Sequence, residues 1–316
     1  MDNKIWNKSV TVREIIFFAF LLLCLLPYIS PPVALLMGIV VAQSIGHPFL
    51  HLNHKATHIL LQFSVVGLGF GMNVDSALQA GKSGFTFTIL SILTTLLLGY
   101  LIGRLLKVDR KSSFLITVGT AICGGSAIAA ISPVIKAQEN QISVALGTIF
   151  ILNAIALFIF PLIGQSLQLS QQQFGIWSAI AIQDTSSVVG AASKYGPEAL
   201  QIATTVKLTR ALWIIPIALL SSLLFRNKGA KIKIPYFIAL FIVAIVLNTY
   251  LPFVKVIGSQ IVQFSKIGLT LTLFLIGSGL SKDVFTSVGF RPILQGLVLW
   301  VLISVPALLA VMYLLG

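Results

Sequence analysis

Charged residues are scarce in this sequence. They make up 9% of the 316 residues, whereas soluble domains carry about 25%, and hydrophobic residues make up 57%. A chain of this composition must be solvated by lipid, which excludes an ordinary soluble domain. Because a bilayer core about 30 Å thick needs roughly 20 apolar residues per helix, the chain can hold about eleven spans joined by short loops. That leaves no room for a soluble catalytic domain.

Cysteine and nucleotide-binding motifs are equally sparse. The two cysteines, Cys24 and Cys123, lie far apart in apolar stretches, so no disulfide framework is predicted. A phosphate-binding loop requires Gly-x4-Gly-Lys-Ser/Thr, but the segment Gly81-Lys-Ser has Ser76 in place of the first glycine. The formal net charge of +13 comes from bases in short loops, which we interpret as topology signals and not as a nucleic-acid surface.

Charged and turn-rich positions divide the chain into eleven predicted spans. The spans cover residues 14–29, 32–45, 58–73, 84–105, 113–135, 141–164, 173–193, 199–224, 234–250, 257–280 and 291–315. The second is short and begins at Pro31-Pro32, so it is expected to be re-entrant or tilted. The first follows a basic tail, but no cleavage site follows Tyr28, so we predict a retained helix and not a signal peptide.

Two strongly basic loops are separated by four of these spans. They contain Arg104, Lys107, Arg110 and Lys111, and then Arg226, Lys228, Lys231 and Lys233. Cytoplasmic loops carry an excess of Lys and Arg. The pattern therefore predicts a multi-pass protein with its N-terminus in the cytoplasm and its C-terminus outside.

Asp184 is the acidic residue predicted to lie near the middle of a span. The other seven acids fall at span ends or in loops. A carboxylate at the bilayer centre costs roughly 2.5 to 3.5 kcal/mol on insertion scales, so it usually faces protein or a water-filled cavity. Asp184 belongs to a run of five polar residues, Gln183 to Ser187. The run predicts a substrate or coupling-ion site, and the alternative is a polar contact between helices.

Lys207 and Arg210 lie in the next predicted span. Their i, i+3 spacing puts them on one helix face. Either both reach toward the membrane interface, or one or both face Asp184 or a bound anion. Arg210 is deeper in the span and is the stronger candidate for an anion ligand.

Gly124-Gly125 and Ser132-Pro133 interrupt an otherwise apolar span. Such a helix is predicted to be broken, and a break exposes backbone amides that can hold an anion. Gly124, Gly125 and Ser126 are therefore candidate anion ligands. The alternative is that the glycines serve only close helix packing.

Two short similarities within the chain suggest internal repeats. Residues 121–126 (AICGGS) resemble 181–186 (AIQDTS), and residues 69–75 resemble 277–283, although their mirrored order does not fit a simple tandem duplication. The four histidines, His47, His51, His54 and His58, are spaced for one helical face, but Pro48 disrupts the helix start. We favour an interfacial role for them over a metal or pH-sensing site.

Three segments resemble the YeiH-like sulfate exporter family of bacterial inner membrane proteins. They are Gly67–Asn73 (GLGFGMN), Ala121–Ala130 (AICGGSAIAA) with Pro133, and Ala181–Ala192 (AIQDTSSVVGAA), and a Lys and an Arg follow at Lys207 and Arg210. The resemblance covers most of the chain. It implies kinship with sodium/proton antiporters and bile-acid symporters.

The fold implied by this resemblance is an all-α polytopic membrane protein of about eleven helices in one domain, residues 1–316. It has inverted repeats, at about 32–164 and 173–315, and broken crossing helices in a core domain beside a panel domain. The break at Gly124-Gly125 would be one crossing helix. The span ending at Ile276–Gly279 would be its partner.

Together these features predict a secondary active transporter of a small anion, such as sulfate or a sulfonate, coupled to H⁺ or Na⁺ by alternating access. The candidate substrate-binding residues are Arg210, Lys207, Gly124, Gly125, Ser126, Ser186 and Ser187, and the candidate ion-coupling residues are Asp184, Gln183, Thr185 and Asn73. A cation/proton antiporter and an anion channel are the alternatives. An enzyme is not expected, because no second acid is predicted at mid-membrane and no HExxH motif occurs. No cofactor beyond the coupling ion and no nucleic acid is expected; the lipid bilayer is a partner, and homo-oligomerisation is open.

Overall fold

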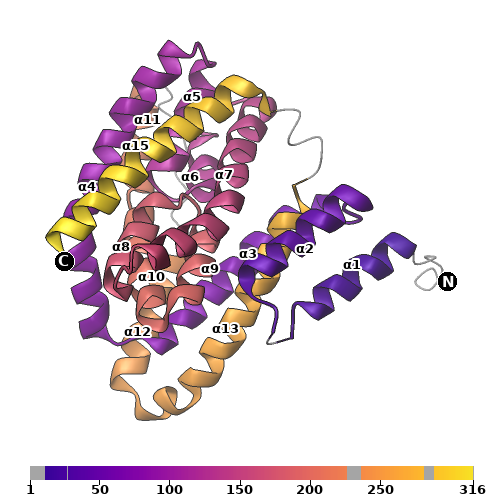
Figure 1. Ribbon diagram of the computed structural model, residues 1–316, viewed down its shortest axis with the longest axis vertical. Helices are drawn as coiled ribbons and strands as arrows, with labels where there is room; N and C mark the ends of the chain where they lie inside the picture. The colour runs from indigo at the N-terminus through magenta and orange to yellow at the C-terminus, as the bar shows by residue number, and fades with distance from the viewer. Residues whose placement is uncertain (1–10, 27, 226–235, 281–287, 316) are drawn as a thin grey trace.

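The protein is a bundle of helices, and the computed structural model describes residues 11–26, 28–225, 236–280 and 288–315 (Figure 1). Within these residues there is no β-strand. The helices are α1 (Val12–Leu23), α2 (Pro31–Ser44), α3 (Leu50–Leu68), η1 (Gly69–Gly71), α4 (Val74–Leu105), α5 (Arg110–Ala121), α6 (Gly125–Ile131), α7 (Glu139–Ser166), α8 (Gln171–Ala181), α9 (Thr185–Tyr195), α10 (Pro197–Ala211), α11 (Ile214–Leu224), α12 (Tyr236–Tyr250), α13 (Pro252–Ser278) and α15 (Phe290–Leu314).

Each predicted span overlaps one of these helices or two consecutive ones. By length and composition, five helices in the described part of the chain are able to cross a membrane, or six if the pair Lys55–Gly71 and Val74–Lys82 is one span bent by 110°. The helix α2, at 14 residues, is among the shorter apolar helices, as its proline-rich start suggested. A count of eleven spans therefore stays a prediction.

The helix ends follow local capping chemistry. The side chain of Asn73 accepts a hydrogen bond from the amide of Ser76 at the start of α4, and Asp109 does the same for Ser112 at the start of α5. Prolines begin α2, α10 and α13, where a missing N–H has no cost. Residues 74–83 fall between two predicted spans, but in the structure they are the first turns of α4, which Asn73 caps.

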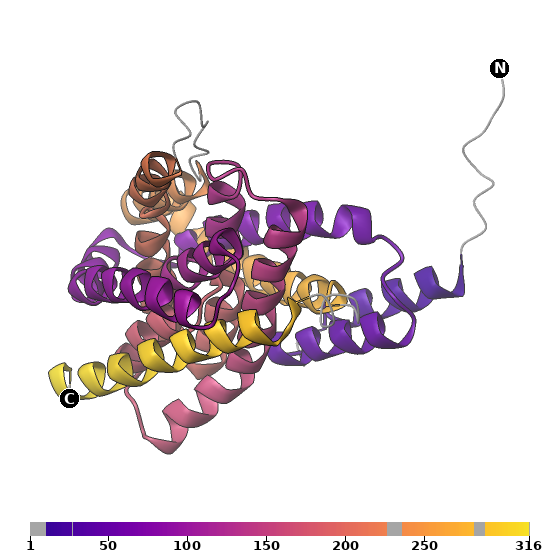
Figure 2. The same ribbon diagram turned by 90° about the horizontal axis from the view of Figure 1, so that it is seen from above.

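The helices form two groups. In one, α1, α2, α3, α12 and α13 pack mainly among themselves, and in the other, α4 to α11 pack with α15. In the view from above, α1 to α3 extend away from the rest of the bundle (Figure 2). The helices α9 and α13 touch where the groups meet. The functional residues predicted from the sequence lie near this junction and inside the second group.

Glycines let α2 and α13 approach backbone to backbone. A Cβ atom added at Gly38 would lie 2.1 Å from the carbonyl oxygen of Phe274, and one added at Gly277 would lie 2.2 Å from that of Leu35. The hydrophobic effect is weak between helices in lipid, so such an interface depends on close van der Waals packing, which small residues allow.

Candidate functional site

Two interrupted helices meet at their breaks. The helix α5 ends at Ala121 and α6 begins at Gly125, while α8 ends at Ala181 and α9 begins at Thr185. A Cβ atom added at Gly124 would lie 3.1 Å from the Cα atom of Asp184, so the two breaks are in direct contact. The similarity between residues 121–126 and 181–186 thus falls on both breaks.

This pairing corrects an expectation from the family resemblance. The partner of the Gly124 break was expected at the end of α13, but α13 is a continuous helix from Pro252 to Ser278. Ile276 near its end and the following Gly279 line a cavity beside the crossing. The glycines there serve a helix end and close packing with α2, and not a break.

Local backbone chemistry explains both interruptions. Gly124 has a positive φ of +66°, which glycine adopts without the steric cost of a side chain. In the second break, the backbone of Ile182 and Asp184 is extended. The amide of Ile182 still donates to the carbonyl of Ser178, as in a helix, but the next two amides do not follow the helical pattern. The side-chain oxygen of Asn153, on α7, accepts hydrogen bonds from the amides of Gln183 at 2.9 Å and Asp184 at 3.1 Å. Buried backbone donors are therefore paired at the break.

Lys207 and Arg210 hold the carboxyl ends of the two half-helices. The ammonium of Lys207 donates to the carbonyl oxygens of Ile182 at 2.7 Å and Ala179 at 3.2 Å. Neither cation has any exposed surface. Because the last carbonyls of a helix lack helical partners and carry partial negative charge, a cation stabilises this end.

The guanidinium of Arg210 makes the equivalent contacts at the other break. Its Nε donates to the carbonyl of Ile122 at 3.3 Å and its Nη2 to that of Ala121 at 2.5 Å. Its Nη1 donates to the hydroxyl of Ser91, on α4, at 2.7 Å. All three nitrogens of the side chain are thus engaged by the protein.

Asp184 occupies the opposite kind of helix end. Its carboxylate accepts hydrogen bonds from the amides of Ser186 at 3.0 Å and Ser187 at 3.4 Å, and from the Ser186 hydroxyl. It caps the N-terminus of α9, where negative charge is favourable. Each charge at the crossing therefore complements a helix dipole, because the cations lie at the carboxyl ends of α5 and α8 and the acid lies at the amino end of α9.

A cavity of about 260 Å³ lies beside the crossing, against the starts of α6 and α9. Asp184, which is 6% exposed, is the carboxylate in its wall, and among the described lining residues there is no Lys or Arg. The polar residues of the wall are Asn53, Thr57, His58, Ser126, Ser143, Asp184 and Ser186. Leucines, Phe150 and Ile276 supply the apolar part.

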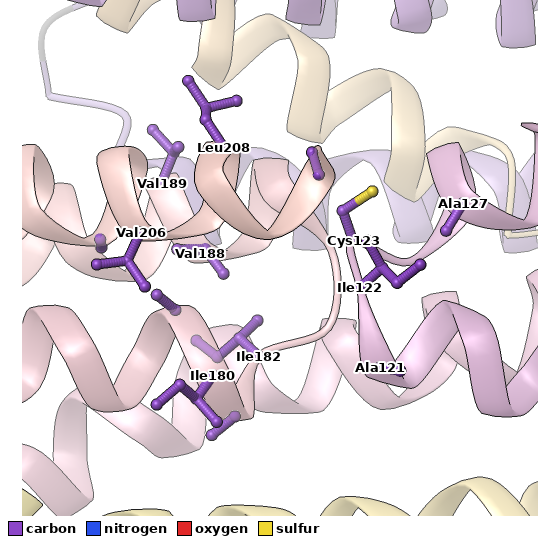
Figure 3. Packing of buried hydrophobic residues seen from close by; sticks show 14 of the residues in the cluster. Ala121, Ile122, Cys123, Ala127, Ile180, Ile182, Val188, Val189, Val206 and Leu208 are labelled. Carbon is purple, nitrogen blue, oxygen red and sulfur yellow. The ribbon is translucent and has the colours of Figure 1, made fainter. Parts of the chain in front are cut away.

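Apolar side chains surround the breaks outside this cavity. Figure 3 shows Ile122 and Cys123 of one break, Ile182 of the other, and valines of α9 and α10 around them. Cys123 is buried, and Ile122 and Ile182 have no exposed surface. Because water is excluded, charge interactions here are much stronger than in solution.

The structure brings some of the predicted residues together and separates others. Gly125, Ser126, Asp184 and Ser186 line the cavity. Gly124, Gln183, Thr185 and Ser187 lie at the breaks but outside the cavity wall, as do Lys207 and Arg210. Asn73 is exposed at the start of α4 and does not line the cavity.

Sequence reasoning missed Asn153, Asn53, Thr57 and Ser143. Asn153 is an amide in the middle of an apolar helix, and that position was a usable signal. The cavity residues of α3 and α7 carried no such signal, because they lie near helix ends where polar residues are common.

The histidines do not share one environment. His58 lines the cavity, whereas the ring of His47 packs 4.9 Å from that of Phe17 and its Nδ1 accepts a hydrogen bond from the amide of Phe49. Burial lowers the pKa of His47 below its ordinary value. The side chains of His51 and His54 lie outside the described part of the structure.

These features define a class: a helical membrane protein in which two interrupted helices cross beside a buried acid. The chain belongs to the family described as conserved hypothetical protein 698, whose sequence profile matches residues 14–296. This is the UPF0324 membrane protein family, and the resemblance to YeiH-like proteins is consistent with it.

Similar curated proteins cover nearly the whole chain. A UPF0324 membrane protein of Bacteroides thetaiotaomicron is 54% identical over 96% of this chain and 94% of its own length. One from Porphyromonas gingivalis is 56% identical over 89% of this chain and 86% of its own, and one from Bdellovibrio bacteriovorus is 49% identical over 94% and 93%. No solved structure matches the chain.

Proposed function

We propose that this protein is a secondary transporter that carries a small anion, together with H⁺ or Na⁺, by alternating access. The observation that carries the proposal is the cavity at the crossing of two interrupted helices, with Asp184 in its wall. A carboxylate kept inside a membrane protein marks an ion or proton path by default. Interrupted helices around such a site are typical of secondary transporters.

Asp184 is the proposed coupling residue. It reaches the cavity, whereas Lys207 and Arg210 donate their hydrogen bonds to backbone carbonyls and not to this carboxylate. A proton or Na⁺ arriving from the cavity neutralises this carboxylate. Ser126, Ser143 and Ser186 supply hydroxyl groups for the solute in the same wall.

The arrangement makes anion and cation bind together. Two like charges 4 Å apart repel by about 4 kcal/mol at an effective dielectric constant of 20. That repulsion lowers affinity roughly a thousandfold, so an anion enters this cavity only after Asp184 is neutralised. The coupling is therefore cotransport, in which each anion moves with one cation.

A cation/proton antiporter is the second candidate. It is favoured by the cavity wall itself, which holds a carboxylate and, among its described residues, no Lys or Arg. In that case a metal cation and a proton compete for Asp184. The two candidates thus predict opposite effects of pH on solute binding.

The test is thermal stability of the detergent-purified protein with sulfate, methanesulfonate or acetate, with and without Na⁺, between pH 5.5 and 8. A ligand that binds the folded state raises its stability by mass action. We expect an anion to stabilise more as pH falls or Na⁺ rises. Asp184→Asn should bind the anion equally at every pH, because the amide imitates the neutral acid, and should lose coupled uptake in liposomes.

Glu139→Gln, an exposed acid at the start of α7, is the matched control and should keep the pH dependence. If Na⁺ stabilises the protein more as pH rises and Asp184→Asn abolishes this effect, the protein is a cation/proton antiporter and not an anion transporter. If no anion stabilises the protein under any of these conditions, the anion proposal is wrong.

Further features belong to the same proposal. They are an inner membrane location, an N-terminus in the cytoplasm and a C-terminus outside, inverted repeats, and no enzymatic activity. The basic loop between α4 and α5 supports this orientation. The second basic loop, residues 226–233, lies outside the described residues.

A further inference from the structure

A second cavity, distinct from the crossing, opens between α4, α5 and α11. Its volume is about 740 Å³. We call it the basic groove, because Arg104, Lys107 and Arg110 lie along it where α4 turns into α5. Apart from these bases, its walls are mainly apolar and include Leu96, Phe114, Ile217, Leu220 and Leu224.

Two of the three bases of the groove contact neutral side chains. Arg104 donates a hydrogen bond to the hydroxyl of Tyr100 at 3.4 Å, and the guanidinium of Arg110 lies 5.2 Å from the ring centre of Phe225. The adjacent acid, Asp109, is engaged by the amide and hydroxyl of Ser112 and by the side chain of Gln141. Three exposed positive charges therefore remain available at one end of an apolar groove.

The groove faces the surroundings of the bundle. Tyr100 is 62% exposed, Leu220 46% and Leu224 53%, although all three are large and mainly apolar. In a membrane protein such a surface contacts hydrocarbon. A ligand here must therefore be negative at one end and apolar at the other.

We propose that the basic groove binds an acidic phospholipid. Its phosphate lies among Arg104, Lys107 and Arg110, and an acyl chain lies along Leu96, Leu220 and Leu224. Basic pockets between membrane helices suit anionic lipid headgroups in this way, and each base near the surface contributes roughly a fivefold gain in binding. A free phosphate ion leaves the apolar walls unused, so the lipid is favoured over it.

The experiment is native mass spectrometry of the detergent-purified protein with phosphatidylglycerol or phosphatidylcholine of identical chains. We expect at least a tenfold preference for phosphatidylglycerol. The triple variant Arg104→Gln, Lys107→Gln, Arg110→Gln should lose that preference. The control triple Lys82→Gln, Lys255→Gln, Lys266→Gln also removes three exposed bases, but outside the groove, and should retain it.

Two further arms separate the lipid from a free anion and from a folding defect. Leu220→Trp partly fills the groove, so it should weaken phosphatidylglycerol binding while leaving all three bases in place. Lipid-free thermal unfolding should be the same for both triple variants. Equal binding of the two lipids, preference retained by the groove triple, or displacement of the lipid by an equal concentration of inorganic phosphate would each overturn the proposal.

Discussion

Replacing Arg210 with Met should destabilise the protein without removing the anion site. The substitution leaves the carbonyls of Ala121 and Ile122 without the guanidinium that they accept from, at 2.5 and 3.3 Å. Each buried polar group left unpaired costs about 1 to 3 kcal/mol, and a cation at a helix carboxyl end contributes up to about 2 kcal/mol.

Part of this loss is offset, because Met does not carry a charge that must be dehydrated. We therefore expect the free energy of unfolding of Arg210→Met to fall by about 3 to 4 kcal/mol. Arg210→Lys retains a charge but not the planar fork of donors, so it should lose about half as much.

Unfolding in denaturant is followed by tryptophan fluorescence in detergent, and anion binding is measured per folded molecule. If Arg210 were instead an anion ligand, as the sequence suggested, its substitution would remove anion binding and leave stability nearly unchanged. A variant that unfolds within about 0.5 kcal/mol of the wild type but has lost anion binding would show that the guanidinium faces the solute. The conclusion that the guanidinium of Arg210 serves to cap the carboxyl end of α5 would then be refuted.

Two other substitutions test the packing around the crossing. Asn153→Leu leaves the amides of Gln183 and Asp184 without an acceptor. It should lower the free energy of unfolding by about 2 to 4 kcal/mol in the same assay. An unchanged stability would mean that the break does not need Asn153. Gly277→Ala places a Cβ atom 2.2 Å from a carbonyl oxygen of α2. It should destabilise the protein by about 1 to 3 kcal/mol and so lower the melting temperature. The control Gly81→Ala, whose Cβ atom meets nothing within 4 Å, should be neutral or stabilising. Equal effects of the two alanines would contradict the close approach of α2 and α13.

Hydropathy by itself located the helices, because the cost of placing polar groups in lipid acts on each residue of a segment. It also singled out Asp184, since an acid in a predicted span stands out whatever surrounds it. The break after Ala121 was predicted from its glycines and is confirmed, whereas the break after Ala181 was not predicted, although the polar run from Gln183 was recognised. These are properties of the chain read one segment at a time.

The tertiary structure decided which groups each of these side chains contacts. Helical spacing put Lys207 and Arg210 on one face, but only the packing of α10 against α8 and α4 directed them to carbonyl groups and away from the cavity. Tertiary packing likewise brought the Gly124 break against Asp184 and not against the end of α13. A helix face is a local property, whereas the neighbour of that face depends on contacts between segments far apart in the chain, and no single segment contains that information.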